Sequence, residues 1–573
     1  MLRFNKINIE NFRNFLKLEL DLRNKNVIFG LNDIGKTNFL CAIRFLLDRD
    51  FRKNGFVDSD YFQKDITKII EITLEIDISQ ENDDDKKIFT YMKGAVSSST
   101  KVVYIQLKAS YSKESLLGQP MLYWGDDLSN LEDIPSTQSY YEIDRLFNVI
   151  YIDSSIQLEN VFKKYISGSF RDENSLTEVE REKIIGNINS LNNSISELSN
   201  VRKIQSDMLN EYNNYRTEKG LSIAIRSEIE VDNISSKLTP YICYNSEKTY
   251  PTSGDGRRKI LAYTLLSLKN KSLEDKKINI FLIEELENHL HRSMQLSLSH
   301  QLFSNILFKY MFLTTHSSLL VSQMDDVNLI KLFKYDNTDG KSYYYKVPKL
   351  YNNMKKKLNQ RLADAIYADT VLLVEGPSER ILFETILEYK CNEYEALGGY
   401  ILEVDGINFV QYYNILKPLG INVIIKTDND LKLNEKKREY NLLGLNRCLP
   451  LIRKQKLKNV SIDSCNEFKE NKKIIQERIY DKIQKSKCEL LRKNYIYLSR
   501  VDLENDLYNI IPDKMEKLVT KNNSSKEPVD YLQSSKMINM IELCNLLTNS
   551  DLDKIFKDDL FTCIKELYEK CNQ

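Results

Sequence analysis

Residues 27–40 read VIFGLNDIGKTNFL, and this stretch decides the fold of the first part of the chain. The apolar run that ends at Phe29 predicts a buried strand, and the apolar spacing after it predicts a helix. Between them, GLNDIGKT has the spacing G-x-x-x-x-G-K-[ST] of a phosphate-binding loop. The backbone N–H groups of such a loop surround phosphates, its lysine reaches the terminal phosphates, and its threonine ligates magnesium. The loop predicts a site for ATP with Mg²⁺, formed by Gly30, Asn32, Gly35, Lys36 and Thr37.

Two later segments supply the other groups that a nucleotide site needs. INIFLI (278–283) predicts a strand that ends in Glu284 and Glu285, one carboxylate for magnesium and the next for the attacking water. In FLTTHSSLL (312–320), His316 follows another apolar run, where it can sense the terminal phosphate. A surface acidic pair and a structural histidine are the alternatives. The order of the segments favours an α/β nucleotide-binding domain, with further strands at Lys6–Glu10, Leu16–Leu22, 66–78, 101–109 and 146–152.

The composition limits the remaining chemistry. The 573 residues suffice for roughly three or four domains, and equal numbers of basic and acidic residues (82 each) mean that any nucleic-acid surface is local. Nine cysteines without a CxxC pair indicate free thiols and exclude a thiolate zinc site. Without a signal-peptide core or an apolar stretch approaching about 18 residues, we expect a soluble, cytoplasmic protein with no membrane partner. All four histidines lie between positions 289 and 316, so a second active site must use carboxylates and lysine.

Carboxylates follow two apolar runs in the second half of the chain. VLLVEGPSER (371–380) predicts a strand ending at Glu375 and a helix with Glu379 in its first turn. IIKTDNDLK (424–432) predicts a strand followed by Asp428 and Asp430. Because catalytic groups lie at the carboxyl ends of parallel strands, we expect these side chains to converge. They fit one or two Mg²⁺ or Mn²⁺ ions, which activate water and neutralise charge on a phosphodiester; scattered surface acids are the alternative.

The segment between the two parts of the nucleotide site has a helical pattern. Its apolar residues step by four and three over about two heptads, which indicates either a dimerising helical insertion or a helix packed on its own domain. The positions of this seam are Ile184, Ile188, Leu191, Ile195 and Leu198. We therefore expect an ATPase part at 1–155, the insertion at 156–240, the rest of the ATPase at 241–345, a linker at 346–366 and a parallel-sheet domain with a helical extension at 367–573.

The motifs of the first half resemble those of the ABC-type ATPase heads of chromosome-maintenance and repair proteins. The resemblance is carried by INIENFRNF (7–15), the phosphate loop, PTSGDGRRK (251–259), the glutamate pair and TTH (314–316). It implies that two heads sandwich ATP, with Ser253 and Gly254 in the signature segment that contacts the nucleotide of a second subunit.

The strand-end glutamate followed by DxD resembles the Toprim domain of topoisomerases, primases and certain nucleases. A head followed by Toprim is similar to the overcoming lysogenization defect (OLD) nuclease family and, within it, to the nuclease subunits of Gabija anti-phage systems. In SRVDLENDL (499–507) the resemblance makes Asp502 and Glu504 candidate metal ligands, and in YLQSSKMINM (531–540) it makes Lys536 the cation that stabilises charge on the scissile phosphate.

This resemblance implies a nucleotide-regulated, metal-dependent endonuclease that nicks or cuts duplex phage DNA. It also implies a homotetramer, a dimer of dimers, with a UvrD-like helicase partner, and inhibition by cellular nucleotides that invading phage relieve. A Toprim topoisomerase is one alternative, because the chain has 34 tyrosines that can act as nucleophiles. An ATP-dependent DNA repair clamp with weak or no nuclease activity is the other. A primase is not expected, because no cysteine or histidine cluster can build its zinc module.

Overall fold

The structure is a computed structural model that describes residues 2–97, 99–137, 140–153, 161, 178–215, 258, 259, 262, 277–288, 290–334, 337–404, 409–483 and 489–572. The chain forms two compact units. The first contains Met1–Tyr151, Ile280–Glu287 and Gln295–Gln573, and the second contains Ile152–Asn279 and Asn288–Met294. The nucleotide loop and the DxD segment both belong to the first unit.

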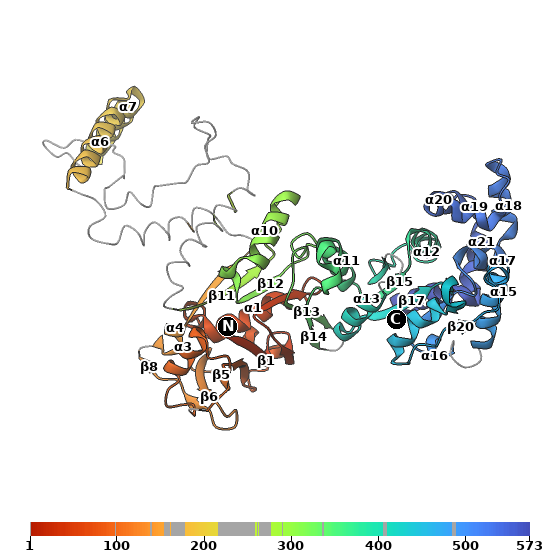
Figure 1. Cartoon of the computed structure of the whole chain (residues 1–573). Coiled ribbons are helices and arrows are strands. Elements are labelled where there is room, and N and C mark those ends of the chain that lie inside the picture. The colour runs from red at the N-terminus through yellow and green to blue at the C-terminus, as the bar shows by residue number, and fades with distance from the viewer. Residues whose placement is uncertain are drawn as a thin grey trace. The chain divides into compact units, whose positions relative to one another are not determined.

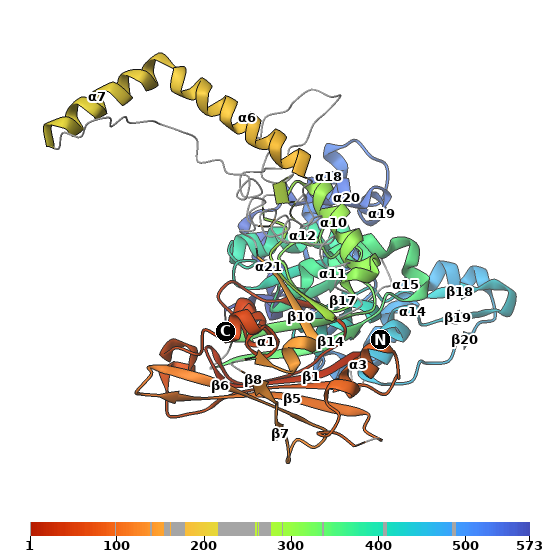
Figure 2. The same cartoon turned by 90° about the vertical axis from the view of Figure 1, so that its left-hand side faces the viewer.

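An antiparallel sheet forms one layer of the head, with strand order β2-β1-β4-β5-β6-β7 (Figure 2). Apolar side chains of β1, such as Ile7 and Ile9, are buried, while the alternating Lys6, Asn8 and Glu10 remain partly exposed, as one covered face requires. The strands are β1 (Arg3–Phe12), β2 (Phe15–Asp21), β4 (Ile70–Asp77), β5 (Val102–Ser112), β6 (Leu117–Gly125) and β7 (Glu132–Asp133). Around them lie α2 (Arg49–Arg52), α3 (Asp83–Tyr91), α4 (Ile143–Leu146) and the ribbon β8 (Ser136–Thr137) and β9 (Tyr140–Tyr141).

A second sheet carries the phosphate loop, with strand order β10-β11-β12-β3-β13-β14. Its central neighbours β11, β12, β3 and β13 are parallel, and β14 is antiparallel to β13. The elements are β10 (Phe147–Ile152), β11 (Ile278–Glu284), β12 (Met311–Thr314), β3 (Lys25–Phe29), β13 (Val327–Lys334), β14 (Thr338–Tyr345), α1 (Lys36–Leu47) and α10 (Arg292–Ser304). The predicted strand–loop–helix around GLNDIGKT and the predicted strands that end at Glu284 and Thr314 are confirmed.

Two long helices form the described part of the expected insertion. They are α6 (Glu178–Glu197) and α7 (Ser199–Tyr215), which follow each other end to end in Figure 2. Leu191 and Leu198 of the predicted seam are 43% and 57% exposed, and Val179, Ile204 and Met208 are exposed as well. The helical character predicted for this segment is confirmed for its described residues. These five apolar side chains are exposed, whereas Ile184, Ile188 and Ile195 of the seam are half-buried.

A four-stranded parallel sheet forms the core of the Toprim-like region, in the order β16-β15-β17-β21. Its central strands β15 and β17 are labelled in Figure 1. Alternate residues of β15 belong to different apolar clusters, Val371 and Leu373 to one and Leu372 and Val374 to the other, so both faces of the sheet are covered. The elements are α11 (Lys355–Ile366), β15 (Thr370–Val374), α12 (Pro377–Lys390), β16 (Gly399–Glu403), α13 (Phe409–Leu416), β17 (Asn422–Thr427) and β21 (Ile496–Leu498). The expected linker 346–366 contains α11, whose Leu362 is fully buried.

The remaining elements include a small antiparallel sheet and the helices of the carboxyl-terminal part. The sheet is β18 (Lys432–Asn434), β19 (Glu439–Asn441) and β20 (Val460–Ser461), directly after the DxD segment. The helices are α14 (Leu443–Cys448), α15 (Cys465–Ile483), α16 (Glu489–Arg492), α17 (Leu503–Ile510), α18 (Pro512–Lys521), α19 (Pro528–Ser534), α20 (Lys536–Cys544), α21 (Asn549–Lys557) and α22 (Thr562–Cys571). Within the described ranges, none of the helices is long and apolar enough to cross a membrane.

Candidate functional site

The phosphate loop lies between β3 and α1, and its lysine is held by the loop itself. Lys36 Nζ donates to the carbonyl oxygens of Gly30 at 3.0 Å and Leu31 at 2.9 Å. Burial lowers the pKa of Lys36, and the surrounding carboxylates oppose this shift. Gly35 has a φ of +107°, and a Cβ there would lie 2.2 Å from the side-chain amide of Asn14. The loop therefore requires glycine at this position and presents a cation to an incoming phosphate.

Glu284 ends β11 beside the phosphate loop. The hydroxyls of Thr37 and Tyr151 both donate short hydrogen bonds to its carboxylate. The sheet register pairs Glu284 with Thr314 of β12, and the expected magnesium ligands Thr37 and Glu284 are thus brought together. Burial and the neighbouring Glu284 carboxylate raise the pKa of Tyr151 far above its ordinary value, so the phenol remains a donor. Sequence reasoning missed Tyr151, because its strand pattern gives no indication of a partner 133 positions away.

His316 and Glu285 also meet at this edge. His316 Nε2 lies 3.4 Å from Glu285 Oε1, and burial followed by the charge of Lys36 lowers the pKa of His316. Glu285 has a φ of +45°, a left-handed conformation that is rare for glutamate and typical of strained functional positions. Glu287, which the sequence did not single out, accepts hydrogen bonds from Thr315 Oγ1 at 2.8 Å and from the His316 backbone.

Three other residues were expected to contact the nucleotide. Asn32 is exposed on the phosphate loop, where it is accessible to a ligand. Ser253 and Gly254 lie outside the described residues, so their role in a second nucleotide contact stays a prediction.

A tyrosine beyond the end of α11 contacts the histidine segment. The Tyr367 ring stacks on the His316 ring with centroids 5.7 Å apart and an interplanar angle of 19°. Its hydroxyl donates to the Thr315 carbonyl at 2.5 Å, and burial raises the pKa of Tyr367 well above its ordinary value. Because β15 begins at Thr370 and leads to Glu375, this contact joins the nucleotide edge to the strand that carries the second candidate site.

At the second site, Glu375 and Asp428 lie side by side after β15 and β17. Glu375 Oε1 accepts hydrogen bonds from Thr427 Oγ1 at 2.6 Å and from the Asp428 backbone at 2.9 Å. Asp428 is 9% exposed, and its Oδ1 accepts from the Ser499 hydroxyl at 3.1 Å. Burial, followed by the charges of Glu375 and Glu379, raises the pKa of Asp428 well above its ordinary value. Two of the carboxylates predicted to converge, those of Glu375 and Asp428, thus belong to neighbouring residues at this edge.

Further polar groups surround Asp428 from the helices. Glu379, in the first turn of α12, has its pKa raised to about 7, chiefly by burial. Glu504 is 1% exposed, burial raises its pKa, and Lys536 Nζ lies 3.4 Å from its Oε1. Asp502 caps α17 instead, with Oδ1 accepting from the Asn505 backbone at 2.8 Å. Of the two predicted ligands in this segment, Glu504 is the better placed.

Arg447 and Asp506 are functional candidates that sequence reasoning missed. Arg447 forms ion pairs with both Glu375 and Asp430. Asp506 is fully buried with its carboxylate 3.6 Å from Lys426 Nζ. Asp506 lies two residues after Glu504 in the segment already singled out, whereas Arg447 belongs to no recognisable spacing and only the tertiary fold brings it to this edge.

The donor set of this site fits a divalent cation. Glu504 Oε2 is buried and makes no hydrogen bond, and such an orphaned oxygen costs about 1–3 kcal/mol unless a ligand satisfies it. The carboxylates around Asp428 are hard oxygen donors of the kind that Mg²⁺ and Mn²⁺ prefer. In the described part of the chain, no three His, Cys, Asp or Glu side chains already enclose a single ion position. An ion would therefore draw these carboxylates closer together.

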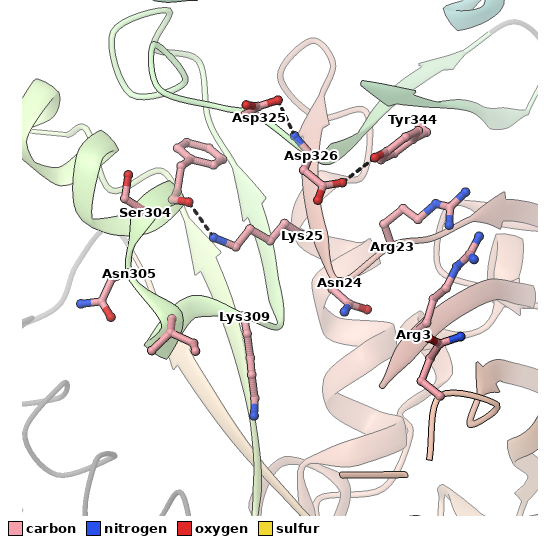
Figure 3. A pocket seen from close by; sticks show the side chains of 13 residues that line it. Arg3, Arg23, Asn24, Lys25, Ser304, Asn305, Lys309, Asp325, Asp326 and Tyr344 are labelled. Carbon is pink, nitrogen blue, oxygen red and sulfur yellow. Dashed lines mark hydrogen bonds between the residues drawn. The ribbon is translucent and has the colours of Figure 1, made fainter. Parts of the chain in front are cut away.

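A separate cavity of about 730 Å³ lies at the opposite, amino-terminal end of β3 (Figure 3). Lys25 Nζ in this cavity donates to the carbonyls of Leu302 and Phe303, and burial lowers the pKa of Lys25 to about 8. Lys309 pairs with Asp84 at 2.9 Å. The lysines of the cavity thus bind the protein itself, and the cavity is remote from both candidate sites.

Comparisons with known proteins agree with the two sites. Residues 366–430 match the family described as "Overcoming lysogenization defect protein-like, TOPRIM domain", and residues 3–122 match the family described as "AAA ATPase domain". The chain is 44% identical over 583 aligned residues to Endonuclease GajA of Bacillus cereus (strain VD045), covering 99% of each protein. The chain belongs to the GajA endonuclease family. It is an enzyme of the OLD type, with an ATP-binding head and a Toprim nuclease domain.

Two more distant similarities cover the separate halves. The chain is 27% identical over 247 residues to the DNA replication and repair protein RecF of Thermoanaerobacter sp. (strain X514), which covers 42% of this chain and 58% of RecF. A solved structure, the C-terminal region of the Burkholderia pseudomallei OLD protein, is 19% identical and covers 35% of this chain and 88% of that one, with a TM-score of 0.20. These similarities are too low to carry an argument about activity.

Proposed function

We propose that this chain is a nucleotide-regulated, metal-dependent endonuclease that nicks or cuts duplex phage DNA in bacterial anti-phage defence. One observation carries the proposal: Glu375 and Asp428 meet at the carboxyl edge of a parallel sheet, and the nearby charges of Glu379, Asp502 and Glu504 also raise the pKa of Asp428. Five carboxylates this close are unfavourable unless cations compensate them. A phosphodiester and divalent cations are the partners that such a site fits.

In this proposal each described side chain has a distinct task. Glu375, Asp428, Asp430 and Glu504 hold one or two Mg²⁺ or Mn²⁺ ions, which supply an activated water and neutralise charge on the phosphate. Glu379 is buried in the first turn of α12 and supplies a further carboxylate beside these ligands. Lys536 lies beside Glu504 with 56% of its side chain exposed, so it can contact a phosphate that approaches from solvent.

The ATPase head regulates this chemistry by binding ATP with Mg²⁺ at Lys36, Thr37 and Glu284. Bound nucleotide contacts the edge where His316 and Glu285 lie, and His316 stacks on Tyr367 before β15. We expect cellular ATP to inhibit cleavage and loss of nucleotide during infection to release it. Differential binding of ATP to the inhibited state is what this control requires.

We further propose a cytoplasmic homotetramer, a dimer of dimers, that acts with a UvrD-like helicase. The exposed apolar side chains of α6 and α7 support self-association, because side chains such as Leu191 and Leu198 are otherwise left in water. Light scattering of the double variant Leu191→Glu, Leu198→Glu tests this. We expect the variant to form a smaller assembly. An unchanged mass would show that these helices do not hold the assembly together.

The first experiment measures cleavage of plasmid and phage DNA with Mg²⁺ or Mn²⁺, with and without ATP. Glu375→Ala should lose cleavage in every condition, whereas Lys36→Ala should cleave and no longer respond to ATP. A tyrosine-linked DNA product would instead identify a topoisomerase. Absence of metal-dependent cutting in the unmodified protein would leave an ATP-dependent clamp.

A further inference from the structure

A short helix brings an arginine between two of the expected metal ligands. Arg447, on α14, contacts Glu375 Oε1 through Nη1, which also donates to Thr427 Oγ1 at 2.8 Å. Its Nη2 donates to Asp430 Oδ2 at 3.0 Å. Only 6% of the Arg447 side chain is exposed. The guanidinium joins Glu375 to Asp430 across the edge of the sheet.

The backbone around Arg447 is fitted to this position. The Gly444 amide donates to the Asp430 carbonyl at 3.0 Å, and a Cβ on Gly444 would lie 2.2 Å from the Asp428 carbonyl oxygen. On the other side, Asn446 donates to the Leu457 carbonyl at 3.0 Å and accepts from the Leu457 amide at 2.6 Å. Because α14 packs directly against the DxD backbone, Arg447 is unlike an exposed ion pair, which has little energetic consequence.

The site therefore has two ends, each with its own positively charged side chain. At one end Arg447 pairs with Glu375 and Asp430, and at the other Lys536 lies beside Glu504. Asp428 lies between them and accepts a hydrogen bond from Ser499 but is not paired with either cation. The carboxylates of Glu375, Glu379, Asp502 and Glu504 all act on it.

A guanidinium and a metal ion hold carboxylate oxygens at different distances. Charge-assisted N–H···O bonds hold carboxylate oxygens about 2.7–2.9 Å from the nitrogen. Mg²⁺ needs its oxygens at about 2.0–2.1 Å. Arg447 contacts Glu375 through Oε1 and Asp430 through Oδ2. An ion that takes these same two oxygens must replace the Arg447 nitrogens.

We propose that Arg447 is a positioning residue that occupies one of two cation positions in the nuclease site. It orders Glu375 and Asp430 before metal binds, and a divalent cation bridges this pair only by displacing the guanidinium. The position beside Asp428 and Glu504 then fills first, and the position at Arg447 fills second and more weakly. The inference rests on the proposed metal-dependent cleavage and specifies how that site is loaded.

The test is Mn²⁺ binding to the full-length, nucleotide-free protein, followed by the electron paramagnetic resonance signal of free Mn²⁺. Every protein carries Glu284→Gln, so that the head adds no manganese site. Arg447→Gln is compared with unsubstituted Arg447, with Arg447→Lys and with Arg453→Gln, which removes an exposed arginine five residues beyond α14. Plasmid cleavage by the unmodified protein is measured with the same Mn²⁺ stock.

With Arg447 present, we expect one tight and one weaker Mn²⁺. Arg447→Gln should tighten the weaker site by about tenfold, because a competing charge-assisted pair is removed. Arg447→Lys should fall between, and Arg453→Gln should match the parent. Identical isotherms for Arg447→Gln and the parent, or loss of both ions in Arg447→Gln, would overturn the inference even if the protein cuts DNA. If the parent binds no Mn²⁺ and the unmodified protein does not cut, the proposed function is overturned as well.

Thermal unfolding distinguishes this role from a purely structural one. Without metal, Arg447→Gln should melt below the parent, because Glu375 and Asp430 lose their partner. Saturating Mn²⁺ should raise its melting temperature by more than it raises the parent's, since tighter ligand binding stabilises the folded state further. A melting temperature that falls and does not recover with Mn²⁺ would mean that Arg447 only supports the fold.

Discussion

The two candidate sites occupy equivalent places in two different sheets but differ in the groups that follow the strands. At the carboxyl end of β3, a glycine-containing loop and Lys36 present N–H groups and a cation to a phosphate. At the carboxyl ends of β15 and β17, Glu375 and Asp428 present oxygens to a cation. The same topology thus serves an anion in one sheet and a cation in the other. What differs is the side chain placed after the strand, and this contrast predicts which substitutions affect which ligand.

The largest expected effect is on the carboxylate edge. Asp428→Asn should lower DNA cleavage by about a thousandfold or more, because it removes a buried carboxylate from the proposed metal site. Nucleotide binding should be unchanged, since no phosphate-loop residue contacts Asp428 among the described interactions. Cleavage rates and nucleotide titration measure the two quantities. Asp463→Asn, an exposed aspartate, is the control; equal losses in both variants would mean that Asp428 has no special role.

At the phosphate loop we expect the opposite result, in which ATP binding is weakened and DNA cleavage is kept. Gly35→Ala should weaken ATP binding by about a hundredfold, because φ is +107° and the new Cβ would clash with Asn14. Cleavage without nucleotide should persist, and its inhibition by ATP should be lost. Gly94→Ala is a matched control, since Gly94 has a φ of +112° but nothing within 4 Å of an added Cβ. If both alanine variants bind ATP normally, the contact between the new Cβ and Asn14 does not control ATP binding.

A smaller effect should come from Tyr367, which contacts the nucleotide site and precedes the strand that carries Glu375. Tyr367→Ala removes both the stack on His316 and the hydrogen bond to Thr315, whereas Tyr367→Phe removes only the hydrogen bond. We expect the ATP-dependent change in cleavage to shrink by about tenfold in the first and less in the second, as a coupling of 1–3 kcal/mol allows. Cleavage is measured against ATP concentration, with Tyr389→Phe on the surface of α12 as control. Full ATP inhibition in Tyr367→Ala would show that regulation takes another route.

Sequence reasoning identified the residues that follow strands but not those that come from elsewhere. The positions of Lys36, Glu284, Glu375 and Asp428 were predictable, because a buried apolar run followed by a polar residue is visible in the chain. Arg447 was not, since it lies 72 positions from Glu375 on a helix of six residues. Tyr151 and Tyr367 were equally hidden, because aromatic residues in apolar runs are usually part of a core. The three-residue strand β21, which brings Ser499 to Asp428, is too short to show a period.

The smallest expected effect concerns the surface next to the carboxylate edge. Lys436, Lys437 and Arg438 are exposed between β18 and β19, directly after the DxD segment. If DNA passes over this small sheet, reversing all three charges to Glu should weaken DNA binding about threefold to tenfold and reduce its salt dependence. Lys554, Lys557 and Lys565 on α21 and α22 are also exposed, and their reversal changes the net charge equally. DNA binding is measured over a range of salt concentrations, and the slope of the logarithm of the binding constant against the logarithm of salt concentration is compared. Equal slopes for both triple variants would mean that the small sheet contributes only its overall charge. A shallower slope for the Lys436, Lys437 and Arg438 variant alone would place phosphate contacts beside Asp430.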